Sequence, residues 1–267
     1  MLRKTYAVIA ALAMAALAAC GGGSSTGTSS GGSSGGGSGQ TLKVGTEGTY
    51  KPFTFHDPKT NKLTGYDVEV VTAVAAKLGR SVQFSESTFD AIFAGLDASR
   101  YDVVANQISV NPERQAKYAF SEPYTVSEGV VVTRADDTSV NSIADVQGKT
   151  SAQSTTSNFA ATAREAGAKV EAVEGFTQAV ALLKQKRVDI TINDNLAVLD
   201  YLKTTGDKGI KIAAKTGDRT EQAFAFRNDS ELPPQFDKAL AQLRADGTLA
   251  KISQKWFAED VSKPAAS

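Results

Sequence analysis

The chain has 267 residues, and its 29 Lys and Arg residues balance its 29 Asp and Glu residues, so the formal net charge is zero. This balance argues against nucleic-acid binding, which needs a basic footprint. One cysteine excludes an internal disulfide, and with one histidine it cannot form an ordinary zinc cluster, so we expect neither a metal nor a cofactor.

The chain opens with a pattern typical of a bacterial export signal. Two basic residues precede an uncharged, mostly apolar run over residues 6–19, which ends at Cys20. This run is shorter than the ~20 apolar residues that cross a bilayer. Residues 17–20 read Leu-Ala-Ala-Cys and look like a lipobox, in which the cysteine sulfur carries the lipid. We therefore expect residues 1–20 to be a lipoprotein signal peptide; an ordinary signal peptide with an incidental cysteine is the alternative.

A tether of small residues follows the signal. Every residue from 21 to 39 is Gly, Ser or Thr, which leaves nothing to bury. A Gly-rich coil of this length spans ~25 Å root-mean-square. Residues 21–40 would therefore hold a globular domain just clear of a membrane.

Strand and helix patterns alternate from residue 41 onward. The first series predicts strands over 42–46, 82–84 and 102–105, with helices over 67–78 and 90–98. The second series predicts strands over 150–152, 170–173 and 188–192, with helices over 157–166, 177–185 and 195–203. Two more helices are predicted near 234–245 and 249–257. This α/β order predicts largely parallel sheets with helices on their faces.

An internal repeat relates the two series. Residues 89–106 align without gaps on residues 176–193, with six identities in eighteen positions. We interpret the repeat as two lobes of similar topology; one sheet with two similar units is the alternative. Two β-branched or apolar segments, 129–133 and 223–227, are predicted to cross between the lobes and to form a hinge. Lobe 1 would then comprise residues 41–130 and 225–262, and lobe 2 residues 131–224.

Polar and aromatic residues follow the carboxyl ends of the predicted strands, where ligands of open α/β sheets bind. The candidate ligand-binding residues are Glu47, Tyr50, Phe53, Phe89, Asn106, Gln107, Ile108, Ser109, Arg114, Gln153, Thr155, Thr156, Ser157 and Asp194. An arginine, two carboxylates, hydroxyls, amides and aromatic rings together suit a small zwitterion.

The anionic end of such a zwitterion has a clear set of partners. Arg114 can bind a carboxylate through two parallel hydrogen bonds. Ser109, Thr155 and Thr156 can complete its shell, and the helix that starts near Ser157 offers backbone N–H groups. Each residue also has a structural interpretation: Arg114 as a solvated helix-start residue, and the two threonines as helix caps.

The other end of the zwitterion has fewer candidates. Asp194 can bind an ammonium group, although it could equally cap a helix. Tyr50 and Phe89 can enclose an apolar part of the ligand, although Phe89 could also belong to the core. His56 lies in a polar segment and is expected to be exposed to solvent.

Four segments resemble the family 3 solute-binding proteins of amino-acid ABC importers: residues 42–53, 65–69, 109–124 and 245–249. The resemblance covers residues 41–262. It implies a type II periplasmic-binding-protein clamshell outside the cytoplasm, working as a monomer with an ABC permease and ATPase and catalysing no reaction. It also implies that Arg114, Ser109 and Thr156 hold a ligand carboxylate, that Asp194 holds its ammonium, and that Tyr50 and Phe89 flank its side chain.

The phrases around Asn106, Gln107 and Gln153, together with Asn193-Asp194, look most like the cystine-binding subgroup. Many family members have small residues at the positions of Asn106 and Gln107. Neutral amides offer hydrogen bonds without a fixed charge, which favours cystine or cysteine as the ligand, followed by glutamine or another polar amino acid.

Two alternatives remain open. Some proteins with this clamshell are dehydratases acting on prephenate-like acids, and Glu47 is the nearest candidate for the required general acid. A ligand-binding protein that docks to a chemoreceptor would need the same closed lobes as an importer receptor.

Overall fold

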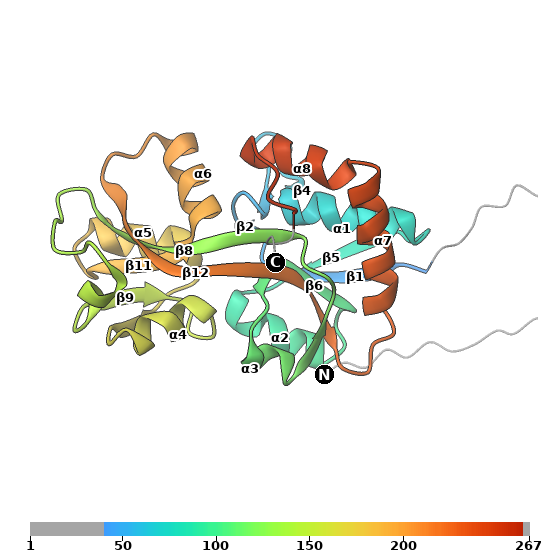
Figure 1. Cartoon of the computed structure of the whole chain (residues 1–267), viewed down its shortest axis with the longest axis horizontal. Helices are drawn as coiled ribbons and strands as arrows, with labels where there is room; N and C mark the ends of the chain where they lie inside the picture. The colour runs from blue at the N-terminus through green and yellow to red at the C-terminus, as the bar shows by residue number, and fades with distance from the viewer. Residues whose placement is uncertain (1–39, 264–267) are drawn as a thin grey trace, which may run out of the picture. The chain divides into compact units, whose positions relative to one another are not determined.

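A computed structural model describes residues 40–263, and the expected signal peptide, Cys20 and most of the tether lie outside this part of the chain. The described residues form two groups of helices and strands, joined by two long strands that run side by side between them (Figure 1). Nine of the strands belong to one mixed sheet, with the path β10-β9-β11-β8-β12-β6-β1-β5 and β7 paired to β12.

Lobe 1 is the group built around a parallel core of β1, β5 and β6. Its strands in this sheet are β1 (Leu42–Thr46), β5 (Val82–Glu86), β6 (Val103–Ser109) and β7 (Tyr118–Phe120). Its helices are α1 (Tyr66–Lys77), α2 (Phe89–Asp97), α3 (Pro112–Gln115), α7 (Pro233–Ala245) and α8 (Thr248–Phe257). A separate three-stranded antiparallel sheet consists of β2 (Thr49–Tyr50), β3 (Thr54–His56) and β4 (Leu63–Thr64).

Lobe 2 is the group built around a second parallel core, in which β9 lies between β10 and β11. Its strands are β9 (Thr150–Gln153), β10 (Lys169–Ala172) and β11 (Ile190–Asp194). Its helices are α4 (Asn158–Glu165), α5 (Gly175–Lys184), α6 (Asn195–Thr205) and the short 3₁₀ helix η1 (Ile143–Val146). The repeat found in the sequence is therefore structural, because α2 followed by β6 corresponds to α5 followed by β11.

The two crossing strands are β8 (Thr125–Arg134) and β12 (Ile210–Arg227), which pair with each other antiparallel. Strand β8 also pairs with β11, and β12 also pairs with β6, so the hydrogen-bonded sheet is continuous from one lobe to the other. The pairing of β12 with β8 shifts register between Lys215 and Arg219. Both crossing strands are longer than the sequence predicted. The fold is the expected two-lobed α/β clamshell.

Alternating burial explains why helices cover both faces of the sheet. In β12, Phe224 and Phe226 pack with helices α1 and α7, whereas Ala225 packs with Ile92 and Leu96 of α2. Successive strand residues point to opposite faces, so a strand that is apolar at every position requires a helix layer on each side.

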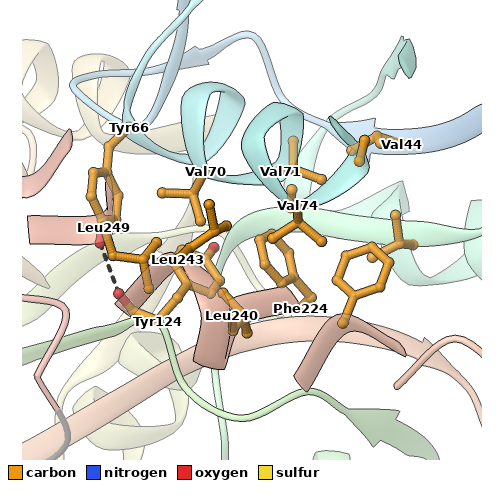
Figure 2. Close-up of a cluster of buried hydrophobic side chains, with 14 of the residues drawn as sticks. Val44, Tyr66, Val70, Val71, Val74, Tyr124, Phe224, Leu240, Leu243 and Leu249 are labelled. Atoms are coloured by element: carbon orange, nitrogen blue, oxygen red, sulfur yellow. Dashed lines mark hydrogen bonds between the residues drawn. The ribbon is translucent and has the colours of Figure 1, made fainter. Parts of the chain in front are cut away.

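The largest core cluster lies between the sheet and helices α1, α7 and α8. Val70, Val71 and Val74 of α1 are fully buried there against Leu240 and other residues of α7, as Figure 2 shows. Burying each such side chain contributes roughly 1.5–3 kcal/mol relative to leaving it exposed. This cluster fixes the lobe from which β1, β6 and α2 extend toward the site.

The turn before α1 requires a glycine. Gly65 has φ 133° and ψ 174°, a backbone conformation accessible almost only to glycine. A Cβ at this position would lie 2.1 Å from the carbonyl oxygen of Phe53. The close approach lets the backbone N–H of Tyr66 and of Asp67 reach the carbonyl oxygens of the preceding segment.

Candidate functional site

The carboxyl ends of β1, β6, β9 and β11 meet at a small cavity of ≈ 50 Å³. Seven of the candidate residues line it: Glu47, Tyr50, Phe89, Asn106, Gln107, Gln153 and Ser157. They come from both lobes, as the strand-end argument predicted. A cavity of this size holds only a water or two, given that a water occupies ~30 Å³.

Two wider cavities flank the small one. A cavity of ≈ 500 Å³ is lined by Ser109, Arg114 and Thr156, and shares Ser157 with the small cavity. A wider space of ≈ 1140 Å³ is lined by Glu47 and Tyr50 together with residues of α5 and α6. Ten of the fourteen candidate residues therefore lie along one cleft between the lobes, narrowest at its centre.

Two of the expected residues belong to the core instead. Phe53 and Ile108 are completely buried. The ring of Phe53 packs 5.0 Å from that of Tyr50 and 5.9 Å from that of Phe257, measured between centroids. Ile108 packs in the cluster beneath α2. Ile108 lies on β6, where alternation turns its side chain toward α2, and Phe53 lies in the turn between β2 and β3.

Arg114 is buried with part of its hydrogen-bonding capacity unused. Its side chain is 7% exposed, and Nη1 donates to the carbonyl oxygen of Ser109 at 3.0 Å, whereas Nη2 has no partner among the described residues. The guanidinium carbon lies 5.7 Å and 5.5 Å from the ring centroids of Phe89 and Phe93. Burial lowers the pKa of Arg114 to about 10. A desolvated guanidinium with a free N–H strongly favours an anionic partner.

Helix α3 places Arg114 in this position. The side chain of Asn111 caps the helix by accepting a hydrogen bond from the backbone N–H of Arg114 at 2.9 Å, and Pro112 occupies the first helical position. The Asn-Pro-Glu-Arg sequence therefore does start a helix, which was the structural alternative for Arg114. The arginine is buried, however, and not solvated as that alternative expected.

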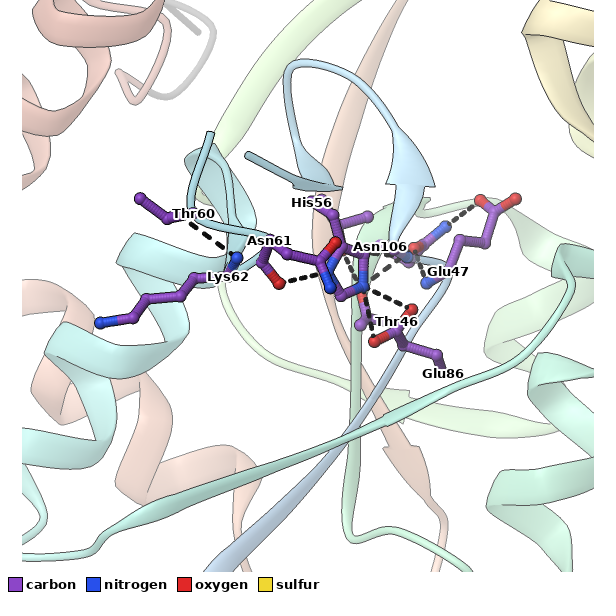
Figure 3. Close-up of polar contacts among 10 residues, drawn as sticks. Thr46, Glu47, His56, Thr60, Asn61, Lys62, Glu86 and Asn106 are labelled. Carbon is purple, nitrogen blue, oxygen red and sulfur yellow. Dashed lines mark hydrogen bonds and ion pairs between the residues drawn. The ribbon is translucent and has the colours of Figure 1, made fainter. Parts of the chain in front are cut away.

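Glu47 and Asn106 form a reciprocal pair at the end of β1 and β6 (Figure 3). The backbone N–H of Glu47 donates to Asn106 Oδ1 at 2.8 Å, and Asn106 Nδ2 donates to Glu47 Oε2 at 2.6 Å. Burial raises the pKa of Glu47 to about 7, opposed by the hydrogen bond from Asn106 and assisted by repulsion from Glu174 and Asp90. Burial thus brings the pKa of Glu47 close to neutral pH.

Gln107 is held in an unusual backbone conformation by Asp67, which the sequence pattern indicates only as the start of a helix. Its φ is 49°, and its backbone N–H and Nε2 donate to the two carboxylate oxygens of Asp67 at 2.7 Å and 2.6 Å. Asp67 is fully buried, and burial raises its pKa to about 7 against the hydrogen bonds from Gln107. The side-chain oxygen of Gln107 has no partner among the described residues, so it is available as an acceptor.

Asp194 caps helix α6 and lies at 2% exposure beside the crossing strands. Its carboxylate accepts hydrogen bonds from the backbone N–H of Leu196 at 2.8 Å and from the hydroxyl of Ser127. Gln222 donates to the same Ser127 oxygen at 2.8 Å, and its side-chain oxygen is unpartnered among the described residues. Burial raises the pKa of Asp194 to about 6, with these hydrogen bonds opposing the rise. Asp194 lines neither of the two cavities nearest Arg114.

Thr155 and Thr156 already have an anionic partner within the protein. Both the backbone N–H and the hydroxyl of each threonine donate to the carboxylate of Asp90 in α2, at distances between 2.7 Å and 3.2 Å. Asp90 was predicted only as the start of a helix. The two threonines do form an anion-binding turn before α4, but in this arrangement a side chain of the other lobe occupies it.

His56 differs from its expected position in a polar loop. It lies at the end of β3, where Nδ1 is 2.9 Å from the carbonyl oxygen of Asn61 and Nε2 is 3.0 Å from the carboxylate of Glu86 (Figure 3). These two contacts raise the pKa of His56. Within residues 40–263, no cluster of three or more His, Cys, Asp or Glu side chains is placed to hold a metal ion. None of the helices in this range is both long and apolar enough to cross a membrane.

Comparisons with known proteins agree with this architecture. Residues 42–259 match the family of bacterial extracellular solute-binding proteins, family 3. The L-cystine-binding protein TcyA of Bacillus subtilis is 52% identical over 98% of this chain and 100% of its own length. The unliganded open L-cystine solute receptor of Neisseria gonorrhoeae is 46% identical, covering 85% of this chain and 96% of its own, with a TM-score of 0.57.

A second solved structure has a higher TM-score than the cystine receptor but a lower sequence identity. An ancestral arginine-binding protein bound to arginine is 36% identical, covering 81% of this chain and 98% of its own, with a TM-score of 0.76. All three proteins are named as binding proteins or receptors rather than as enzymes. Matched along almost all of its described length, the chain belongs to the bacterial extracellular solute-binding proteins of family 3.

Proposed function

We propose that this protein is the lipid-anchored receptor of an amino-acid ABC importer and that its ligand is L-cystine. The observation that carries the proposal is the 52% identity to an L-cystine-binding protein along the whole of both chains. The chemistry of the cleft supports a ligand of this kind. Its centre presents the amides of Asn106, Gln107 and Gln153, which recognise polar groups without requiring a charged side chain.

The carboxylate of the ligand would bind at Arg114. The unpartnered Nη2 of Arg114 would supply one charge-assisted hydrogen bond. Ser109 and Ser157 line the same cavity of ≈ 500 Å³ as Arg114, and their hydroxyls would supply further hydrogen bonds. The ammonium group would bind beside Asp194. Ser127 forms hydrogen bonds with both Asp194 and Gln222. The unpartnered side-chain oxygen of Gln222 would therefore be a second acceptor for the ammonium group.

Ligand entry requires the lobes to separate, because the central cavity of ≈ 50 Å³ is too small for an amino acid. The motion would be a hinge rotation in β8 and β12, the two strands that join the lobes. We place the lobe boundaries at residues 41–130 with 225–262, and 131–224. Closure around the bound ligand would present both lobes to the permease, which with its ATPase is the expected partner.

A melting assay against the twenty amino acids and L-cystine tests the ligand. A ligand at 100 times its dissociation constant stabilises the folded state by about 2.7 kcal/mol. For a domain of this size that raises the melting temperature by about 5–10 °C. We expect this shift with L-cystine and a smaller one with glutamine. If no compound in the panel moves the transition, the proposed function is wrong.

The anchor depends on Cys20, which lies outside the described residues. Replacing it by Ser removes the sulfur that the lipid would occupy. We expect the wild-type protein in the membrane fraction of expressing bacteria and the Cys20→Ser protein in the soluble extracytoplasmic fraction. Equal distribution of the two proteins would remove the lipid anchor from the proposal.

A dehydratase is the second candidate, and one observation favours it. Glu47 has a pKa of about 7 because it is buried, so it could donate a proton to a leaving hydroxyl near neutral pH. We expect no turnover of prephenate or arogenate, since the relatives named above are binding proteins. Turnover that is lost in Glu47→Gln would favour the enzyme over the receptor.

A further inference from the structure

The contact between Asp90 and the Thr155–Thr156 turn joins residues 65 and 66 positions apart and connects the two lobes. Oδ2 of Asp90 accepts from the backbone N–H and hydroxyl of Thr155 at 3.2 Å and 2.8 Å. Oδ1 accepts from the same two groups of Thr156 at 3.0 Å and 2.7 Å. One carboxylate of lobe 1 thus receives four hydrogen bonds from lobe 2.

Both sides of this contact are fixed within their own lobes. Asp90 is the second residue of helix α2, where the helix N-terminus favours a negative charge. On the other side, Arg164 of α4 donates to the carbonyl oxygen of Thr155 at 3.3 Å and 3.4 Å, and Ser157 caps the same helix. The backbone on each side of the contact is thus held by its own lobe, which limits the conformational entropy lost when the contact forms.

The charge state of Asp90 is consistent with a tight contact. Burial alone would raise its pKa, but the hydrogen bonds from Thr156 and Thr155 outweigh burial, and the pKa lies below its usual range. The carboxylate is therefore ionised at neutral pH. Hydrogen bonds to a charged group contribute more than those between neutral groups.

A second polar contact between the lobes also borders the central cavity. The hydroxyl of Tyr50 donates to Asn193 Oδ1 at 2.7 Å. Leu196 and Ala197 at the start of α6 also pack into the core cluster of lobe 1. Tyr50 and Asn193 line the small cavity, and so do Phe89 and Ser157, which are the chain neighbours of Asp90 and Thr156.

The two solved structures compared above match this chain to different degrees. The TM-score is 0.57 against the open cystine receptor, despite 46% identity. It is 0.76 against the arginine-bound protein, at only 36% identity. This chain thus superposes better on the ligand-bound structure than on the open one, and Asp90 makes its four hydrogen bonds in this arrangement.

We propose that Asp90 is a positioning residue that holds the two lobes closed and thereby slows release of the ligand. The part concerning ligand release rests on the proposed function. Asp90 touches no ligand atom in this account and acts through the Thr155–Thr156 turn.

The test measures closure and release separately. Two labels, at Ala76→Cys of α1 and Lys208→Cys after α6, report the distance between the lobes in a Cys20→Ser background; both sites are exposed. Stopped-flow displacement of bound L-cystine reports the release rate. Asp90→Asn keeps the shape of the side chain but removes its charge. Asp97→Asn, on the same helix and contacting Tyr118 of the same lobe, is the matched control.

We expect Asp90→Asn to lower the closed fraction and to raise the release rate about tenfold, with little change in the association rate, as for the loss of charge-assisted hydrogen bonds. Thr155→Ala, which retains the backbone N–H, should raise release about threefold. It should have little further effect in the Asp90→Asn protein, because the two changes remove one contact. Asp97→Asn should match the wild type.

The outcomes separate this inference from the proposed function. If L-cystine binds and Asp90→Asn changes neither the lobe distance nor the release rate, the role of Asp90 is wrong while the receptor proposal stands. If no amino acid binds, the receptor proposal fails. The lobe distance in the free protein then tests whether Asp90 holds the lobes closed. A free protein without a closed population, or one whose closed population is unaffected by Asp90→Asn, overturns the inference.

Discussion

Replacement of Arg114 by methionine tests the proposed binding site at its most strongly charged point. Methionine keeps the apolar length that packs near Phe89 and Phe93 but removes the guanidinium. Losing one partner of a buried charge pair costs about 2–5 kcal/mol in binding. Taking about 4 kcal/mol, the dissociation constant for L-cystine should rise about 1,000-fold. Isothermal titration calorimetry measures this change directly.

The same variant should leave the free protein folded. Burial lowers the pKa of Arg114 to about 10, so its charge is already disfavoured where it lies. Removing a desolvated charge without an ionic partner should change the unfolding free energy by no more than about 1 kcal/mol. Arg100→Met, at an exposed position, is the matched control and should bind normally. A dissociation constant for Arg114→Met within tenfold of the wild-type value would refute the assignment of the ligand carboxylate to this residue.

Two further predictions concern stability. The pKa of Glu47 is raised from 4.5 to about 7, so its contribution to stability is complete below pH 4.5 and is lost as the pH rises through 7, by at most about 3 kcal/mol. In Glu47→Gln the unfolding free energy measured in urea should fall less between pH 5 and 8; an unchanged decline would contradict the assigned pKa. Gly65→Ala should lose about 2–4 kcal/mol in the same assay, because its Cβ would meet the carbonyl oxygen of Phe53 at 2.1 Å. Gly79→Ala, with nothing within 4 Å of its Cβ, should lose about 1 kcal/mol, and equal losses would contradict the steric explanation.

The strand ends were predictable because their physical cause is local. Alternating strand and helix patterns locate the ends of β1, β6, β9 and β11 within a few residues, and parallel strands bring those ends to one edge. Glu47, Asn106 and Gln153 accordingly line one cavity. The asparagine-capped start of α3 was also readable from Asn-Pro-Glu-Arg, although its burial was not.

Other features depend on contacts that sequence spacing does not contain. Whether Phe53 lies in the cleft or in the core depends on how the turn between β2 and β3 packs against the lobe. Asp67 and Asp90 read as ordinary residues in the first turns of helices, and their partners Gln107 and Thr156 lie 40 and 66 positions away. Only tertiary packing brings such carboxylates to their donors, so no local pattern indicated their roles.

The first half of β12 and the three-stranded sheet were missed for a related reason. Residues 210–222 contain many polar side chains and a glycine at position 217, and read as a loop. They form a strand because β8 offers a paired edge along most of its length, with register shifts that absorb the irregular positions. The strands β2 and β4 have two residues each, too short to give an alternating pattern.

Mass spectrometry of the ligand carried by the protein tests the receptor proposal most directly. The full chain would be purified from cells without added amino acids, denatured, and its released small molecules identified and quantified against the protein. We predict L-cystine as the principal compound, released in near-equal amount to the folded protein and absent from Arg114→Met prepared in parallel. A different amino acid in near-equal amount, or L-cystine at the same level from both proteins, would contradict the account.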